Sequence, residues 1–77
     1  MYKLFKKDKK LILLDYSNEE SDVIDSLGSY IGYDEESHYQ IYYQENDKIE
    51  LKCNINSLDD YINYKYNSNY KVKRLRR

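Results

Sequence analysis

Proline, alanine, threonine and tryptophan are absent from the sequence, which contains only one cysteine, one histidine and two glycines. A single cysteine, Cys53, excludes an internal disulfide and the framework of a small secreted scaffold, so we expect the chain in the cytoplasm. Two isolated glycines, Gly28 and Gly32, are too few for a glycine-rich phosphate-binding loop. The longest apolar run, Leu11 to Leu14, is far short of the roughly 20 residues of a membrane-spanning helix, and no signal peptide precedes it. We therefore expect neither secretion nor a membrane partner.

The residues able to carry chemistry are also few. Cys53 lies on the apolar side of a predicted strand, where a free cysteine usually acts as a small hydrophobe rather than as a nucleophile paired with His38. One imidazole is too few for a zinc site, and the acidic run Asp34 to Glu36 has neither the alternate spacing nor the glycine of a calcium loop. We expect a protein that is not an enzyme and that uses no cofactor and no metal.

The length of the chain indicates one small domain, residues 1–77, which buries only about 60 to 65 % of the surface of its unfolded chain. Leu, Ile, Val and Phe together number eighteen, above the roughly 20 % share below which disorder is expected, so a folded domain is favoured. Tyrosine, asparagine, isoleucine and lysine make up thirty-five of the 77 residues, which is typical of a genome rich in A and T.

Two short strands are predicted at the start of the chain, Tyr2 to Lys7 and Lys10 to Tyr16, with a polar turn between them. Within the second strand, the continuous apolar run Leu11 to Leu14 suits a strand that is covered on both faces, although periodicity alone does not distinguish it from a buried helical turn. The charges on both sides of the run favour the strand.

A helix is predicted over Asn18 to Ile31. Ser17 and Glu20 have the spacing of a capping box, in which each side chain accepts from the backbone amide of the other residue. Gly32 is expected to be the left-handed residue after the last turn, with Gly28 as a second candidate for the helix end. On a helical projection the apolar side chains fall in one arc: Tyr30, Val23, Leu27, Ile31 and Ile24.

Two segments with alternating apolar residues, 39–43 and 49–55, predict a β-hairpin after the acidic run Asp34 to Glu36. A loop with an odd number of residues, Asn46 to Lys48, brings the two apolar sets to the same face, whereas a two-residue loop would put them on opposite faces. The odd loop predicts three cross-strand pairs: Tyr43 with Leu51, Ile41 with Cys53, and Tyr39 with Ile55.

Ser57 and Asp60 repeat the capping logic and begin a second, shorter helix that ends near residues 67–69. Residues 70–77 alternate apolar and basic residues, so they form either an edge strand protected by charge or a basic tail. The expected fold class is α+β, in the order β-β-α-β-β-α(-β). A mostly antiparallel sheet of four strands, or five with the C-terminal segment, carries two helices on one face. The apolar side of the second helix consists of Leu58, Tyr61, Ile62 and Tyr66.

Charge is strongly segregated along the chain. Ten acidic residues and no lysine or arginine lie between Leu11 and Asp47, while ten of the thirteen basic residues lie in residues 1–10 and 71–77. A solvated face that serves solubility is one explanation, but such surfaces usually mix both signs, and outward carboxylates can imitate the phosphates of a nucleic acid. We predict that five carboxylates without a role at the helix start bind a basic partner: Asp22, Asp25, Asp34, Glu35 and Glu36.

The eleven tyrosines divide into two groups. Four fall on the predicted apolar faces and are expected in the core: Tyr30, Tyr39, Tyr43 and Tyr61. Tyr33, Tyr42 and Tyr64, together with Tyr70, fall off those faces. Exposed tyrosine is favoured at interfaces because it offers a large rigid contact area with a polar tip. We predict that Tyr33, Tyr42 and Tyr64 contribute to partner binding, and the alternative is codon bias on a tolerant surface.

The basic ends support a different hypothesis, direct binding of RNA or DNA. The N-terminal lysines would contact a phosphate backbone together with a C-terminal cluster, while Tyr2, Tyr70 or Phe5 stack on bases. An isoelectric point near 5.8 argues against a dedicated nucleic-acid binder, which is normally basic as a domain, but a ribosome-associated factor would work through its ends alone. The C-terminal cluster consists of Lys71, Lys73, Arg74, Arg76 and Arg77.

In length, A/T-rich composition, acidic segregation and the absence of a catalytic constellation, the chain resembles the small inhibitors that phages and other mobile elements direct against host defence enzymes, such as anti-CRISPR proteins. The resemblance is one of type and rests on no alignable motif. It implies a non-enzymatic viral protein in the host cytoplasm. Such a protein would block a basic nucleic-acid-binding protein or ribonucleoprotein complex by steric and electrostatic exclusion of DNA or RNA. The sequence leaves the oligomeric state open, and a homodimer is compatible with it.

Overall fold

The computed structural model describes residues 1–34 and 36–68 of the chain. The segment 70–77, predicted above as an edge strand or a basic tail, lies outside the described residues. Six elements follow one another in the described part: β1 Tyr2–Lys7, β2 Leu11–Ser17, α1 Glu20–Tyr33, β3 His38–Glu45, β4 Lys48–Ile55 and α2 Leu58–Asn67.

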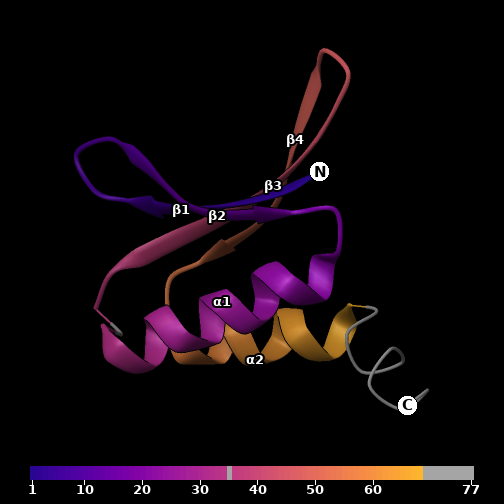
Figure 1. Ribbon diagram of the computed structural model, residues 1–77. Helices are drawn as coiled ribbons and strands as arrows, with labels where there is room; N and C mark the ends of the chain where they lie inside the picture. The colour runs from indigo at the N-terminus through magenta and orange to yellow at the C-terminus, as the bar shows by residue number, and fades with distance from the viewer. Residues whose placement is uncertain (35, 69–77) are drawn as a thin grey trace.

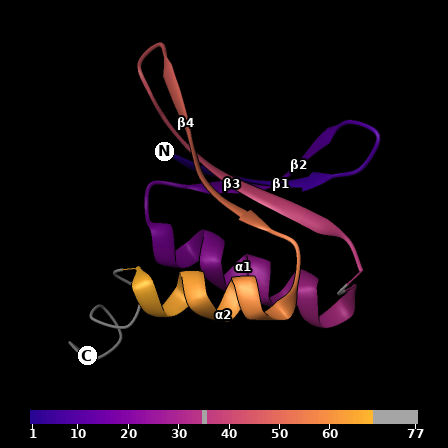
Figure 2. The same cartoon turned by 180° about the vertical axis from the view of Figure 1, so that it is seen from behind.

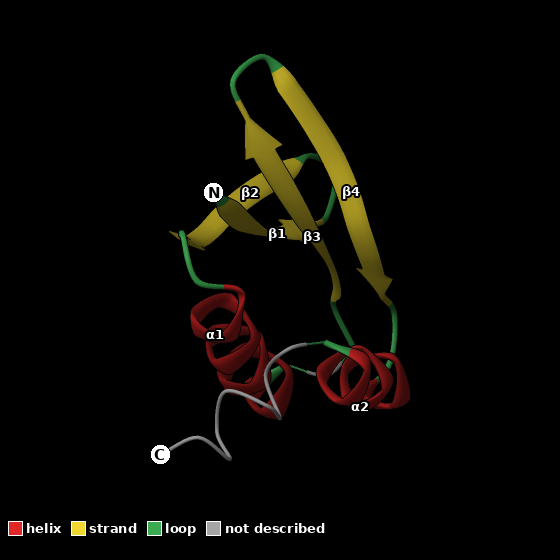
Figure 3. Cartoon of the chain, turned by 90° about the vertical axis from the view of Figure 1, so that its right-hand side faces the viewer, coloured by secondary structure: helices red, strands yellow, loops and turns green. Residues whose placement is uncertain are grey.

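The four strands form one antiparallel sheet in the order β2-β1-β3-β4, so β2 and β4 are its edges. The two helices lie side by side on the same face of this sheet, as the front and back views show (Figures 1 and 2). In the side view, the other face carries no helix of the described part, and the tip of the β3–β4 hairpin extends away from the helices (Figure 3). The predicted α+β architecture and element order are confirmed.

The core lies between the central strands and α1. Leu4 from β1 and Ile41 from β3 are fully buried against this helix. The buried residues of α1 are Val23, Ile24, Leu27 and Ile31. They confirm the predicted apolar arc except for Tyr30, which is 38 % exposed. Because burying one such aliphatic side chain contributes roughly 1.5–3 kcal/mol, the contact between α1 and the sheet is the main source of stability.

The second helix, α2, covers the same face beside α1 but buries no residue completely. Tyr61 and Tyr64 pack against the core from this helix while remaining partly exposed. Its start is as predicted, because the Ser57 hydroxyl accepts from the Asp60 amide at 3.2 Å and satisfies one amide of the first turn. Within the described residues, neither helix is long and apolar enough to cross a membrane.

The first helix begins later than predicted, and the capping box between Ser17 and Glu20 is absent. Ser17 still belongs to β2 and pairs with β1, so the chain reaches the helix only at Glu20. The Ser17 hydroxyl accepts from the Glu19 amide at 3.0 Å and donates to the Asp22 carboxylate at 2.7 Å. The Glu20 carboxylate accepts instead from the Tyr64 hydroxyl of α2. Strand pairing and helix packing therefore override the local capping motif.

The first helix also continues past its predicted end. Gly32 lies inside the helix, and no described glycine has a positive φ, so the prediction of a left-handed Gly32 is wrong. The helix ends at Tyr33, and the following amide of Asp34 donates to the Tyr30 carbonyl at 2.8 Å. The Tyr39 hydroxyl of β3 donates to the Asp34 carbonyl at 3.1 Å. Because a side chain of β3 supplies a hydrogen bond to the backbone at the end of the helix, no glycine cap is required.

The β3–β4 hairpin has a two-residue loop, so the prediction of an odd loop is wrong. Glu45 pairs with Lys48, and Asn46 takes a left-handed φ of 57°, which asparagine tolerates better than most residues. A β-bulge next to Tyr42 then shifts the register by one residue. Two predicted pairs are confirmed and one is wrong: Ile41 faces Cys53 and Tyr39 faces Ile55, but Tyr43 faces Glu50. A bulge and an odd loop align the inner pairs equally well, so alternation alone does not distinguish them.

The apolar run from Leu11 to Leu14 is not covered on both faces, contrary to the prediction. Leu13 pairs with Phe5, and Phe5 alternates with the buried Leu4, so Leu13 points away from the helices. Leu11 and Leu13 are 45 % and 47 % exposed, whereas Leu14 packs against the core. The physical reason is that both helices lie on one side of the sheet, which leaves half of this strand without a cover.

Candidate interaction surfaces

The outward side of α1 carries two of the predicted acidic residues. The prediction that Asp22 has no role at the helix start is wrong, because Asp22 lies in the first turn and its carboxylate accepts from the Ser17 hydroxyl at 2.7 Å. Asp22, Asp25 and Tyr33 are exposed, and their spacing puts them on one side of an α-helix, opposite the buried side. Tyr33, at the C-terminal end, is 94 % exposed. At 1.5 Å per residue these three positions extend over about 16 Å. This surface, Asp22, Asp25 and Tyr33, is named the acidic helix face.

Asp34 is tied to the fold. Its carboxylate accepts from Ser37 Oγ at 2.7 Å and forms an ion pair with Lys6 Nζ at 3.5 Å. The hydrogen bond from Ser37, reinforced by Lys6, holds the pKa of the Asp34 carboxyl below its usual value. Glu36 is exposed in the following turn, and Glu35 lies outside the described residues. Sequence reasoning missed the structural role of Asp34 because Lys6 lies 28 positions away in the chain.

The three tyrosines predicted for partner binding do not form one patch. Tyr33 belongs to the acidic helix face, whereas Tyr42 lies on the opposite face of the sheet, half-buried against Phe5. Tyr64 is half-buried and its hydroxyl donates to the Glu20 carboxylate, so the prediction that Tyr64 is exposed is wrong. Burial, together with the Glu20 carboxylate, raises the pKa of Tyr64 well above its usual value. Tyr64 therefore holds α2 against α1.

The face of the sheet opposite the helices, named the open sheet face, was not anticipated from the sequence. Directly paired residues in an antiparallel sheet point to the same side, so the register puts Leu13 beside Phe5 and Leu51 beside Tyr42. Phe5 meets Tyr42 edge to face, with ring centroids 5.5 Å apart. These four side chains form a row across all four strands, named the apolar row. The one signal in the sequence was the continuous apolar run around Leu13, which we assigned to a second buried face.

The open sheet face carries charge of one sign only, as far as the described strands are concerned. Lys3 and Lys7 of β1 point to the open sheet face, on the same side as Phe5. The acidic residues of the described strands point to the helix side: Asp15, Glu45 and Glu50. Lys6 and Lys48 point to the helix side as well, so that side carries both signs, whereas the described strands direct only basic side chains to the open sheet face.

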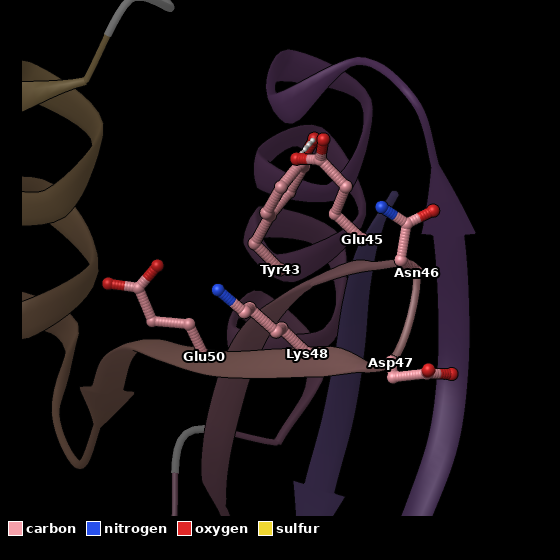
Figure 4. A pocket seen from close by; sticks show the side chains of 6 residues that line it. All are labelled: Tyr43, Glu45, Asn46, Asp47, Lys48 and Glu50. Carbon is pink, nitrogen blue, oxygen red and sulfur yellow. Dashed lines mark hydrogen bonds between the residues drawn. The ribbon is translucent and has the colours of Figure 1, made fainter.

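The tip of the β3–β4 hairpin forms a hollow of about 460 Å³ (Figure 4). The Tyr43 hydroxyl donates to the Glu45 carboxylate at 3.2 Å, and the negative charge of Glu45 raises the pKa of Tyr43. The other lining residues are Asn46, Asp47, Lys48 and Glu50. All six come from one hairpin, so the hollow has no second wall. Over residues 1–34 and 36–68, no group of three or more histidine, cysteine, aspartate or glutamate residues is placed to hold a metal ion.

The histidine and the cysteine lie on opposite sides of the sheet. His38 is exposed and its Nδ1 is 2.7 Å from Asn56 Oδ1. Cys53 packs partly buried against the core, as predicted, and burial raises the pKa of its thiol. A Cys–His nucleophile pair is incompatible with this arrangement.

No family model, curated protein or solved structure matches this chain. The C-terminal basic cluster, Lys71, Lys73, Arg74, Arg76 and Arg77, lies outside the described residues. Two surfaces of the described residues are candidates for binding, the acidic helix face and the open sheet face.

Proposed function

We propose that this protein is a non-enzymatic inhibitor that binds a basic, nucleic-acid-binding protein through its acidic helix face and excludes DNA or RNA from that protein. The observation that carries the proposal is the exposure of Asp22, Asp25 and Tyr33 on one side of α1, in a stretch of chain without lysine or arginine. A phage or mobile-element protein of the anti-CRISPR type would use such a surface in the host cytoplasm against a defence enzyme or ribonucleoprotein complex.

The spacing of the carboxylates suits a groove that normally holds a phosphate backbone. Side chains three positions apart on a helix have Cβ atoms about 5–6 Å apart, so Asp22 and Asp25 present two neighbouring negative charges. A nucleic-acid-binding groove presents lysine and arginine side chains that neutralise successive phosphates, and these would pair with the carboxylates. Exposed Glu19 and Glu36 extend the negative field beyond both ends of the helix face. The field would steer the protein to a basic surface before contact.

Charge alone would not hold the complex, because exposed ion pairs contribute only about 0–1 kcal/mol each. Tyr33 supplies the missing contact, because it is 94 % exposed and lies at the end of the acidic helix face. An aromatic side chain that inserts into a partner pocket can contribute about 2 kcal/mol or more. In the proposed complex the carboxylates provide orientation and rate of association, and Tyr33 provides much of the affinity.

The test is a pull-down from the native host with three forms of the full chain, with and without nuclease. The first is the wild type, and the second carries Asp22→Lys and Asp25→Lys. The third is a matched control with Asp47→Lys and Glu50→Lys, which changes the net charge equally at exposed positions of the β3–β4 hairpin. We expect a basic protein to be captured by the wild type and the control in the presence of nuclease, and lost with the helix variant.

The captured protein is then tested for its own nucleic-acid binding. Labelled DNA or RNA should be displaced by the wild type and by the hairpin control, but not by the helix variant. Circular dichroism checks that all three forms are folded, since Asp22 lies in the first turn of α1 and its replacement by lysine costs about 0.3–1 kcal/mol of helix stability. Recovery of nucleic acid alone, or capture that the helix variant leaves unchanged, would refute the proposal.

A further inference from the structure

The open sheet face combines an aromatic pair with an apolar border. Phe5 and Tyr42 occupy the two central strands, and Leu13 and Leu51 extend the apolar row to both edges. The two leucines, which lie on the edge strands, are 47 % and 43 % exposed. Sheets that expose aromatic rings in their central strands provide platforms on which unpaired bases stack.

A hydrogen-bonded amide network lies directly beside the aromatic pair. Gln40 is 8 % exposed, and its amide donates to Asn54 Oδ1 at 2.7 Å while its oxygen accepts from the Tyr42 hydroxyl at 2.9 Å. This network borders a hollow of about 630 Å³ at the end of the sheet near the β1–β2 turn. The hollow is lined by Lys7, Asp8, His38, Tyr39, Gln40, Asn54 and Asn56. His38, Asn54 and Asn56 are exposed, and imidazole and amide groups of this kind form hydrogen bonds with bases that are not already paired.

The charge on this face is positive. Lys3 and Lys7 project from β1 on the same side as Phe5, and exposed Lys9 and Lys10 follow in the adjoining turn. The described strands direct no carboxylate to this side, and Asp8 in the turn is the one acidic residue at the rim of the hollow. The face therefore attracts a polyanion, whereas the helix side of the same strands carries both signs of charge.

We infer that the open sheet face binds single-stranded nucleic acid, with bases stacked on Phe5 and Tyr42 and phosphates contacted by Lys3 and Lys7. Charge complementarity favours this occupant over a second copy of the chain. Two copies packed face to face would bring the lysines of both β1 strands together across the interface, and like charges that meet in this way oppose association. This surface lies on the opposite side from the acidic helix face, so the inference does not depend on the proposed inhibition.

The test is fluorescence anisotropy with labelled oligonucleotides of dT and rU, about 12 nucleotides long, and the full chain at salt concentrations between about 50 and 200 mM. We expect binding to at least one of them that weakens with salt. The two oligonucleotides distinguish DNA from RNA as the ligand. A duplex of the same length should bind more weakly, because its bases are already stacked and paired.

Substitutions separate the two kinds of contact. Lys3→Gln with Lys7→Gln should lower the slope of log affinity against log salt by about 1.4, since each phosphate contact on a single strand contributes about 0.7. Phe5→Leu keeps an apolar side chain but removes the ring, and it should weaken binding about 5-fold or more. The matched controls are Lys48→Gln with Lys65→Gln, which removes the same charge elsewhere, and Tyr33→Leu on the acidic helix face. Both controls should leave binding close to that of the wild type.

The outcomes that overturn the inference are distinct from those that overturn the inhibitor proposal. Absence of binding to both oligonucleotides at low salt refutes it, and so does binding that survives Lys3→Gln, Lys7→Gln and Phe5→Leu in folded protein. A dimer in sedimentation experiments that dissociates with Leu13→Lys would show that a second copy covers the face, which also refutes it. Reversal of Asp22 and Asp25 should leave oligonucleotide binding intact or stronger, whatever its effect on a protein partner.

Discussion

Replacing Gly28 by alanine should destabilise the protein, although alanine is the better helix former. Gly28 lies in the middle of α1, beside the Tyr61 side chain of α2. A Cβ atom at this position would lie 2.5 Å from the hydroxyl oxygen of Tyr61 and 3.1 Å from its Cζ atom. Both distances are shorter than ordinary van der Waals contact, so the Tyr61 ring must move.

The magnitude follows from two opposing effects. Alanine gains about 1 kcal/mol over glycine in a helix interior. Overpacking of a well-packed contact typically costs about 1–3 kcal/mol. Because the clash involves a ring that is itself packed against the core, we expect the second effect to be larger and the net loss to be about 1 kcal/mol. In a domain of this size such a loss lowers the melting temperature by roughly 4–8 °C.

Gly32 provides a matched control in the same helix. A Cβ atom there meets nothing within 4 Å, and neither glycine has a positive φ. Gly32→Ala should therefore stabilise the protein, by up to about 1 kcal/mol. Both variants are measured by urea unfolding followed by circular dichroism. If Gly28→Ala stabilises the protein as much as Gly32→Ala does, the close approach of the two helices is refuted.

A double-mutant cycle identifies the cause of the loss. Tyr61→Leu removes the hydroxyl and the outer part of the ring that a Cβ atom at position 28 would meet. In this background Gly28→Ala should no longer destabilise the protein, because only the gain in helix propensity remains. An equal loss in both backgrounds would mean that the effect arises elsewhere than at Tyr61.

Two further predictions concern the polar contacts that fasten the helices. Tyr64→Phe should lower the free energy of unfolding by about 1–3 kcal/mol, because it leaves the partly buried Glu20 carboxylate without the hydroxyl that donates to it. Tyr33→Phe, at the exposed end of α1, is the control. The pKa of Asp34 is lowered in the folded state, so its contribution to stability is present at neutral pH and is lost as the pH falls below its ordinary value of 3.8. Asp34→Asn should reduce the loss of stability between neutral pH and acid, measured by urea unfolding at several pH values, whereas Asp47→Asn in the hairpin turn should not. If the wild type and Asp34→Asn lose the same free energy of unfolding between neutral and acidic pH, the assignment to Asp34 is wrong.

The candidate surfaces were only partly predictable from the sequence. The exposure of Asp22 and Asp25 followed from the period of α1, because the apolar arc identifies the side of a helix that packs against the rest of the protein. The role of Asp34 did not, because its ion pair with Lys6 joins residues 28 positions apart. The same is true of Tyr64, whose partner Glu20 is 44 positions away and which had been placed among the exposed tyrosines.

By itself, the sequence determined the elements, their order and the fold class. Alternation in β3 and β4, the arc of apolar residues in α1 and the serine at the start of α2 are local patterns, and local patterns report which side of each element is apolar. The charge segregation is likewise a property of the chain alone.

Only the tertiary structure decided which apolar sides were covered. Both helices pack on one face of the sheet, so Leu13 and Leu51 remain exposed beside Phe5 and Tyr42, although their pattern resembles that of buried residues. The tertiary structure also decided between a two-residue loop with a bulge next to Tyr42 and an odd loop without a bulge, because both arrangements bury the same inner pairs. The physical reason is that burial depends on contacts between distant segments, whereas periodicity reports only the preference of each segment for a partner.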